Sequence, residues 1–184
     1  MPGQSMKSLL KTFRNDSSGS VTVEAVIVLP LLVLILVATL VFNDMYGFKN
    51  VRQKATFTVA DMISRETQPI TAGYLDGAMD LFDTMTTNNG TNALRVSQVR
   101  YDGVSDSFSV DWSQVRGAGS LSAWTNADVQ GAHGWLPALT DGERVLVVDS
   151  TAQYQSVFDV GQGQPDVEAR VFFSPRFAPQ VVYQ

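Results

Sequence analysis

The sequence predicts an α+β fold that has a long N-terminal helix, one short helix and an antiparallel sheet of about four strands. Residues 20–64 keep apolar side chains at helical spacing, whereas beyond residue 94 the apolar period changes from about 3.6 to 2. An antiparallel sheet of this kind buries one face against a helix. We expect three parts: a basic leader at 1–19, the long helix at 20–65 and a globular α+β domain at 66–184.

The composition excludes several functional classes. The chain has 184 residues, of which 45% are apolar and 17% charged, as in a folded protein of one domain with an accessory segment. It has no cysteine and a single histidine, His133, so disulfides, thiolate metal sites and multi-histidine sites lack their residues. The net charge of −5 argues against phosphate neutralisation. We therefore expect no metal, no cofactor and no nucleic-acid partner.

The first half of the long helix is apolar enough to cross a membrane. Residues 21–42 read VTVEAVIVLPLLVLILVATLVF, with Glu24 as the one charge and Pro30 as the one proline. A helix of this length spans roughly 33 Å, and a hydrocarbon core is about 30 Å thick. The sequence therefore predicts a single-pass membrane segment, whose residues include Val21, Ala25, Pro30, Leu36 and Phe42.

A basic leader precedes this segment and carries Lys7, Lys11 and Arg14. The apolar stretch is longer than the 7–15 residues typical of a cleaved secretory signal, and no small-x-small site follows it. We therefore expect it to remain as an anchor, with the N-terminus inside and the rest exported. The balance of charges supports export, because residues 66–184 hold six basic residues, all arginine, against fourteen acidic ones.

The helical pattern continues beyond the membrane segment and ends before Pro69. Lys49, Arg52 and Lys54 lie mostly off the apolar stripe, which we expect to pack against the exported domain. The stripe has spacings of three and four and comprises Met45, Phe48, Val51, Ala55, Val59 and Met62.

The spacing of apolar residues in 71–86 predicts the short helix, with Thr71 as its N-cap. Asp76, Asp80 and Asp83 fall on one side of it. Three carboxylates could bind a cation, but the pattern favours a solvated face.

The remaining chain predicts four strands. Residues 94–101 and 107–112 alternate with period 2 and form a hairpin around the turn at 102–106. Residues 143–158 are the strongest strand, and residues 167–173 close the sheet.

Between the hairpin and the third strand, residues 117–139 are irregular and contain Trp124 and Trp135. These rings could form a partner surface or cover the sheet, and covering is favoured. No GxSxG, HExxH or phosphate-binding loop occurs in the sequence, so we expect no enzymatic activity.

Glu24 is the unusual residue of the membrane segment. A carboxylate costs about 2.5–3.5 kcal/mol at mid-span and by default marks a function. Here it follows the small polar stretch 15–20, and it is the fifth residue counted from Ser20, which Gly19 precedes.

A basic leader, a glycine and an apolar helix with glutamate at position five resemble the TadE/TadF-like pseudopilins, or minor pilins, of the Tad (Flp-type) pilus system. The resemblance implies that a prepilin peptidase cuts between Gly19 and Ser20. Major Flp pilins are shorter and carry a tyrosine after the glutamate, where this chain has Ala25, which favours the minor-pilin branch. Residues 173–176 also look like the family's C-terminal strand and tail.

The resemblance implies a minor pilin that primes, caps or assembles an adhesive pilus. Expected partners are the membrane, other pilin subunits, the prepilin peptidase and the Tad secretion machinery. The expected location is the inner membrane, with a cytoplasmic N-terminus, a periplasmic domain and incorporation into an extracellular pilus. The alternative is an uncleaved, signal-anchored periplasmic binding domain that recruits an envelope partner. Cleavage at Gly19 and dependence on Glu24 separate the two hypotheses.

Overall fold

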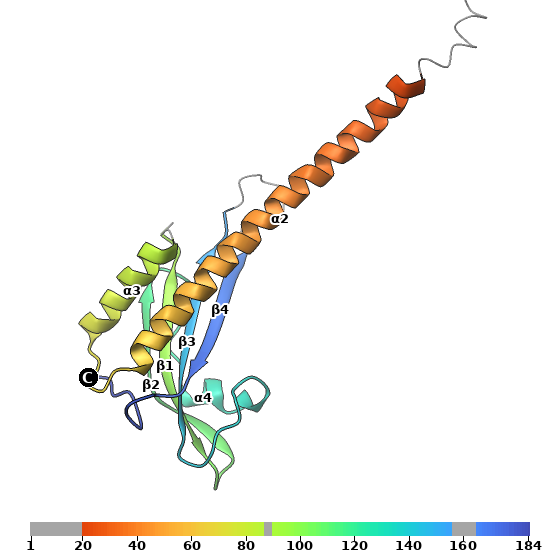
Figure 1. Cartoon of the computed structure of the whole chain (residues 1–184). Helices are drawn as coiled ribbons and strands as arrows, with labels where there is room; N and C mark the ends of the chain where they lie inside the picture. The colour runs from red at the N-terminus through yellow and green to blue at the C-terminus, as the bar shows by residue number, and fades with distance from the viewer. Residues whose placement is uncertain (1–19, 87–89, 156–164) are drawn as a thin grey trace, which may run out of the picture. The chain divides into compact units, whose positions relative to one another are not determined.

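The computed structural model describes residues 20–86, 90–155 and 165–184 (Figure 1). The chain divides into two compact units between Asn43 and Asp44. A long helix, a short helix and a four-stranded antiparallel sheet confirm the predicted α+β fold.

The long helix α2 runs from Ser20 to Ser64, as the sequence predicts, and continues through Pro30. A proline inside a helix removes one backbone hydrogen bond. The backbone nevertheless stays α-helical on both sides of Pro30.

The sheet has the strand order β2-β1-β3-β4, and every neighbouring pair is antiparallel. The strands are β1 (Ala93–Asp102), β2 (Ser107–Gly117), β3 (Arg144–Gln153) and β4 (Asp166–Phe173).

Two strand ends differ from the prediction by more than one residue. Strand β2 continues to Gly117 instead of ending at Trp112, because the register shifts opposite Gln98 and Val99 and reverses the alternation of faces. Strand β3 ends at Gln153, and the last residues of the predicted strand 143–158 lie outside the described part of the chain.

One face of the sheet packs against the second half of α2 and against α3 (Ala72–Thr86), as Figure 1 shows. The backbone N–H of Tyr74 donates to the Thr71 hydroxyl at 3.3 Å, which confirms the predicted N-cap. The core contributed by the two helices consists of Ala55, Val59, Ala60, Ile63, Leu75, Ala78, Met79 and Phe82.

The predicted apolar stripe of α2 is wrong at two positions. Val51 is 44% exposed, whereas Arg52 is only 2% exposed and lies in the interface with the domain. The sequence pattern placed Arg52 off the apolar stripe because its side chain is charged. Its long side chain instead lies inside the domain, with its guanidinium against the ring of Phe48.

The opposite face of the sheet is covered by the chain between β2 and β3, which holds α4 (Asn126–Val129) and the short 3-10 helix η2 (Ala132–Gly134). Between the sheet and this chain lies a second core, which consists of Val99, Phe108, Val129, Ala132, Leu136, Val145 and Val147. Trp124 and Trp135 pack against this core, and their ring centroids are 5.3 Å apart. The prediction that these rings cover the sheet is confirmed.

The C-terminal tail, residues 174–184, packs against the core that the two helices form with the sheet. The Arg176 N–H donates to the Ser64 carbonyl at 2.9 Å, where α2 ends. Farther along, the Trp112 indole N–H donates to the Val181 carbonyl at 2.8 Å. The tail therefore joins the end of α2 to strand β2.

Candidate functional site

The first unit contributes an apolar helical surface. Among the described residues, α2 is the one helix long and apolar enough to cross a membrane, and none of its most apolar stretch is buried. Most of the large apolar side chains from Val23 to Phe42 are 40–69% exposed. A soluble surface rarely exposes so many contiguous apolar side chains, so this half of the helix needs lipid or other helices around it.

Two polar side chains interrupt this surface between residues 23 and 42. The Thr39 hydroxyl donates to the Ile35 carbonyl of the same helix at 2.8 Å, so the helix itself satisfies it. The other is Glu24, which is exposed and which forms no hydrogen bond or ion pair within the described residues.

Glu24 lies one helical turn after Ser20, the first residue of α2. Residues four apart share one face of a helix, about 6 Å apart along its axis. Ala25, Pro30, Leu36 and Phe42 are exposed along the same helix. The other processing residue, Gly19, and the side chains of Ser20 and Val21 lie outside the described part of the structure.

The second unit begins with a contact that attaches α2 to the domain. The Tyr154 hydroxyl donates to the Asp44 carboxylate at 2.6 Å, and the Tyr154 ring packs edge-to-face on Phe48 at 5.1 Å. The guanidinium of Arg52 lies 3.3 Å from the centroid of the same Phe48 ring. These residues form a polar and aromatic column along about two turns of the helix, from Asp44 to Arg52.

Arg52 ends this column inside the protein. One of its terminal nitrogens donates to Asn92 Oδ1 at 3.3 Å, and its Nε has no hydrogen-bond partner. Burial lowers the pKa of Arg52 to about 10. A short bond of 2.7 Å between the hydroxyls of Thr56 and Ser150 continues the polar line toward the sheet. The sequence pattern missed this interface because its partners lie far apart in the chain.

Two of the three aspartates that the sequence places on one side of α3 have protein partners. Asp76 pairs with Arg116, and Asp83 accepts a hydrogen bond from Asn92 at 2.7 Å. Within the described residues, no group of three or more potential ligands is placed to hold a metal ion.

Comparison with known proteins gives one match. Residues 19–60 match the family model described as TadE-like protein, which confirms over this segment the resemblance found in the sequence. No curated protein and no solved structure matched the chain. The matched segment contains Glu24, the exposed apolar surface and the Asp44 contact to the domain. Over these residues the chain is similar to TadE-like proteins, and the match is consistent with a pilin of the Tad system.

Proposed function

We propose that this protein is a minor pilin, or pseudopilin, that primes, caps or assembles a Tad-type adhesive pilus after its leader is removed between Gly19 and Ser20. The observation that carries the proposal is the exposed apolar half of α2, with Glu24 near its start, inside the TadE-like segment. A helix of this kind anchors the subunit in the membrane first and packs among other helices in a filament afterwards.

Glu24 has a specific role in this proposal. Cleavage before Ser20 creates an α-amino group, which is mostly charged at neutral pH because its ordinary pKa is near 8. In a bundle of staggered parallel helices, the Glu24 carboxylate of one subunit meets the Ser20 ammonium of its neighbour. Pairing offsets the desolvation of both groups, whereas removal of one partner costs about 3–5 kcal/mol. The pair therefore sets the register of neighbouring helices.

The proposed location follows from the distribution of charge. Lys7, Lys11 and Arg14 keep the N-terminus in the cytoplasm, and the domain at 66–184 is exported to the periplasm. The partners are the prepilin peptidase, other pilin subunits and the Tad secretion machinery. The role is structural and involves no catalysis.

The first experiment measures the intact mass and the N-terminal sequence of the protein recovered from its native membrane. A chain that begins at Ser20 supports the proposal. A chain that retains Lys7 to Gly19 contradicts it, because the amine that Glu24 would meet is then absent, and the anchored binding domain becomes the better description.

A second experiment replaces the carboxylate alone. We expect Glu24→Gln to be cleaved and to remain in the membrane but to be lost from sheared pilus fractions. Glu168→Gln, on the exposed side of β4, is the matched control and should assemble normally. Normal assembly of Glu24→Gln would contradict the proposed register contact.

A further inference from the structure

A small cavity lies where the β1–β2 hairpin meets the chain after η2. Its volume is about 190 Å³, and it is lined by the rings of Tyr101, Phe108 and His133 and by residues 136–139. This is room for roughly six water molecules at about 30 Å³ each, and it is below the ~300 Å³ at which pockets for drug-sized ligands begin. The cavity therefore fits a single extended side chain.

The three rings form a fixed wall. Phe108 and His133 pack edge-to-face with centroids 4.9 Å apart, and Tyr101 lies 5.0 Å from Phe108. Asp106 joins two of them, because its Oδ1 accepts from the Tyr101 hydroxyl at 2.7 Å and lies 3.0 Å from His133 Nε2. The hydrogen bond to Tyr101 lowers the pKa of Asp106, so this carboxylate is ionised at neutral pH.

The charge around the cavity is negative. The hydrogen bond to Asp106 is the largest cause that raises the pKa of Tyr101, and the charges of Asp106, Asp141 and Asp102 add to it. The arginines of this end of the sheet, Arg100 and Arg144, are paired with Asp111. Aromatic faces next to a carboxylate attract a cation, and the aliphatic wall at residues 136–139 suits a hydrocarbon stem. The matching side chain is lysine, which carries an ammonium group on four methylenes.

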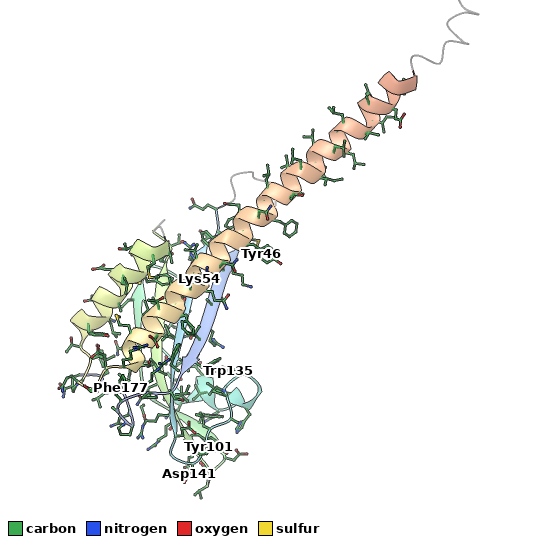
Figure 2. The ribbon with its side chains drawn as sticks, viewed as in Figure 1. Tyr46, Lys54, Tyr101, Trp135, Asp141 and Phe177 are labelled. Carbon is green, nitrogen blue, oxygen red and sulfur yellow. The ribbon has the colours of Figure 1, made fainter. Side chains whose placement is uncertain are left out.

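The chain itself carries a suitable lysine at the other end of the domain. Lys49 is exposed, forms no ion pair within the described residues, and follows Asp44 by five residues along α2. Tyr101 and Asp141 lie at the opposite end of the domain from Tyr46 and Lys54 in Figure 2. The register of the sheet agrees with this view. The hairpin lies at one end of β1, whereas Ala93 lies at the other end, next to the Asn92 that Arg52 contacts. The cavity and Lys49 of one copy therefore cannot meet each other.

We propose that this cavity receives the side chain of Lys49 from a second copy of the chain. When two copies stand in parallel, one above the other, the hairpin end of the lower domain faces the Asp44 end of the upper one. The two surfaces differ, so the contact is heterologous, and each of the two copies uses a different face. This inference rests on the proposed function, because a pilin-type assembly holds its subunits in parallel.

The occupant is tested by carbodiimide crosslinking of the full chain in detergent micelles, with equal amounts of ¹⁴N- and ¹⁵N-labelled protein. The reagent joins a carboxylate directly to a lysine amine. We expect mixed-isotope peptides that link Lys49 to Asp106, Asp102 or Asp141. Lys49→Gln should remove them, whereas the matched control Lys54→Gln, also exposed on α2, should keep them. Crosslinks that survive in Lys49→Gln would overturn the assignment of Lys49.

The chemistry of the cavity is tested separately by NMR titration of the same full chain with Nα-acetyl-lysine methylamide. The probe should shift the ring signals of His133 and the methyl signals of Leu136 and Leu139. Nα-acetyl-norleucine methylamide, which keeps the four side-chain carbons without the ammonium group, should bind about tenfold more weakly. The lysine probe should lose a similar factor with the variant Asp106→Asn.

Equal binding of the lysine and norleucine probes would overturn the cation site. Binding of the lysine probe without Lys49 crosslinks would overturn the second copy as occupant and would leave a lysine of another protein. Either failure, together with a native N-terminus at Ser20, would remove this inference and leave the proposed function standing.

Discussion

The hydroxyl of Tyr154 donates a 2.6 Å hydrogen bond to the carboxylate of Asp44, across 110 residues of sequence. Tyr154 directly follows β3 and is 3% exposed, and Asp44 is the first residue of the second unit. The second half of α2 is therefore attached to the sheet from its beginning, and the apolar half of the helix ends one residue before Asp44.

We expect Tyr154→Phe to lower the free energy of unfolding of the domain by about 1 kcal/mol. The phenyl ring keeps the edge-to-face contact with Phe48, and water can hydrate the exposed Asp44 carboxylate after its hydrogen bond to Tyr154 is lost. Thermal unfolding of the full chain in detergent, followed by near-ultraviolet circular dichroism, measures the change. Tyr46→Phe is the control, because Tyr46 is 64% exposed on the same helix. An equal effect of both variants would contradict the role of the Asp44 contact.

The second core depends on a buried carboxylate, Asp149. It accepts two hydrogen bonds from the guanidinium of Arg95, at 3.0 and 2.7 Å, and a third from Arg170. Arg95 is also stacked at 4.2 Å on the ring of Trp124. The network holds the chain between β2 and β3 on the outer face of the sheet.

Asp149→Asn should therefore be severely destabilising. It leaves the Arg95 charge, whose side chain is 8% exposed, without its counter-ion, and such a loss costs about 3–5 kcal/mol. Glu168→Gln, on the exposed side of neighbouring β4, should change stability by no more than about 0.5 kcal/mol. Chemical denaturation of both variants measures the difference. A small effect of Asp149→Asn would mean that the tryptophans alone hold the covering chain.

The elements that the sequence predicted correctly have a strong local signal. The apolar run and helical spacing define α2, the polar Thr71 marks the start of α3, and period-2 alternation defines the strands. Glu24 stood out because it is the single charge within an apolar run.

The parts that sequence reasoning missed depend on long-range contacts or on broken periods. Arg52 looks like a surface charge in the sequence, which does not show its contact with Asn92, 40 residues away. The end of β2 was missed because the bulge beside Val110 places Trp112 on the other face of the sheet. The cavity beside His133 lies between the β1–β2 hairpin and a loop about 30 residues later in the chain. No spacing of residues in the sequence predicts that these two segments meet.

Two glycines in left-handed conformations allow a matched test of strain against steric conflict. Gly142 has φ +76°, and a Cβ there would meet nothing within 4 Å. Gly117 has φ +91°, and its Cβ would lie 2.2 Å from the Asn92 carbonyl oxygen. Gly142→Ala should cost about 1–2 kcal/mol from backbone strain alone. Gly117→Ala should cost distinctly more, because backbone atoms at the end of the β1–β2 pair must move. Unfolding midpoints of the two variants provide the comparison, and equal midpoints would contradict the predicted conflict.

Stability should fall in acid because carboxylates cap the turns of the domain. Asp128 accepts from the N–H and hydroxyl of Thr125 at 2.7 and 2.8 Å, and Glu143 does the same for Thr140 at 2.8 and 2.9 Å. In both, the backbone hydrogen bond is the largest cause that lowers the carboxyl pKa below its ordinary value of 3.8 or 4.5. A lowered pKa means that the ionised form stabilises the folded state. The contribution is complete above the ordinary values and is lost as the pH falls through the lowered ones.

We therefore expect the melting temperature to fall as the pH is lowered from about 5 toward 2. The double variant Asp128→Asn/Glu143→Gln removes both titrating caps, so it should be less stable than the wild type at neutral pH and lose less on acidification. Each single variant should lie between these two curves, because the two turns are separate. Differential scanning calorimetry across this pH range measures the slopes. A double variant that loses as many degrees in acid as the wild type would show that these two caps do not cause the acid sensitivity.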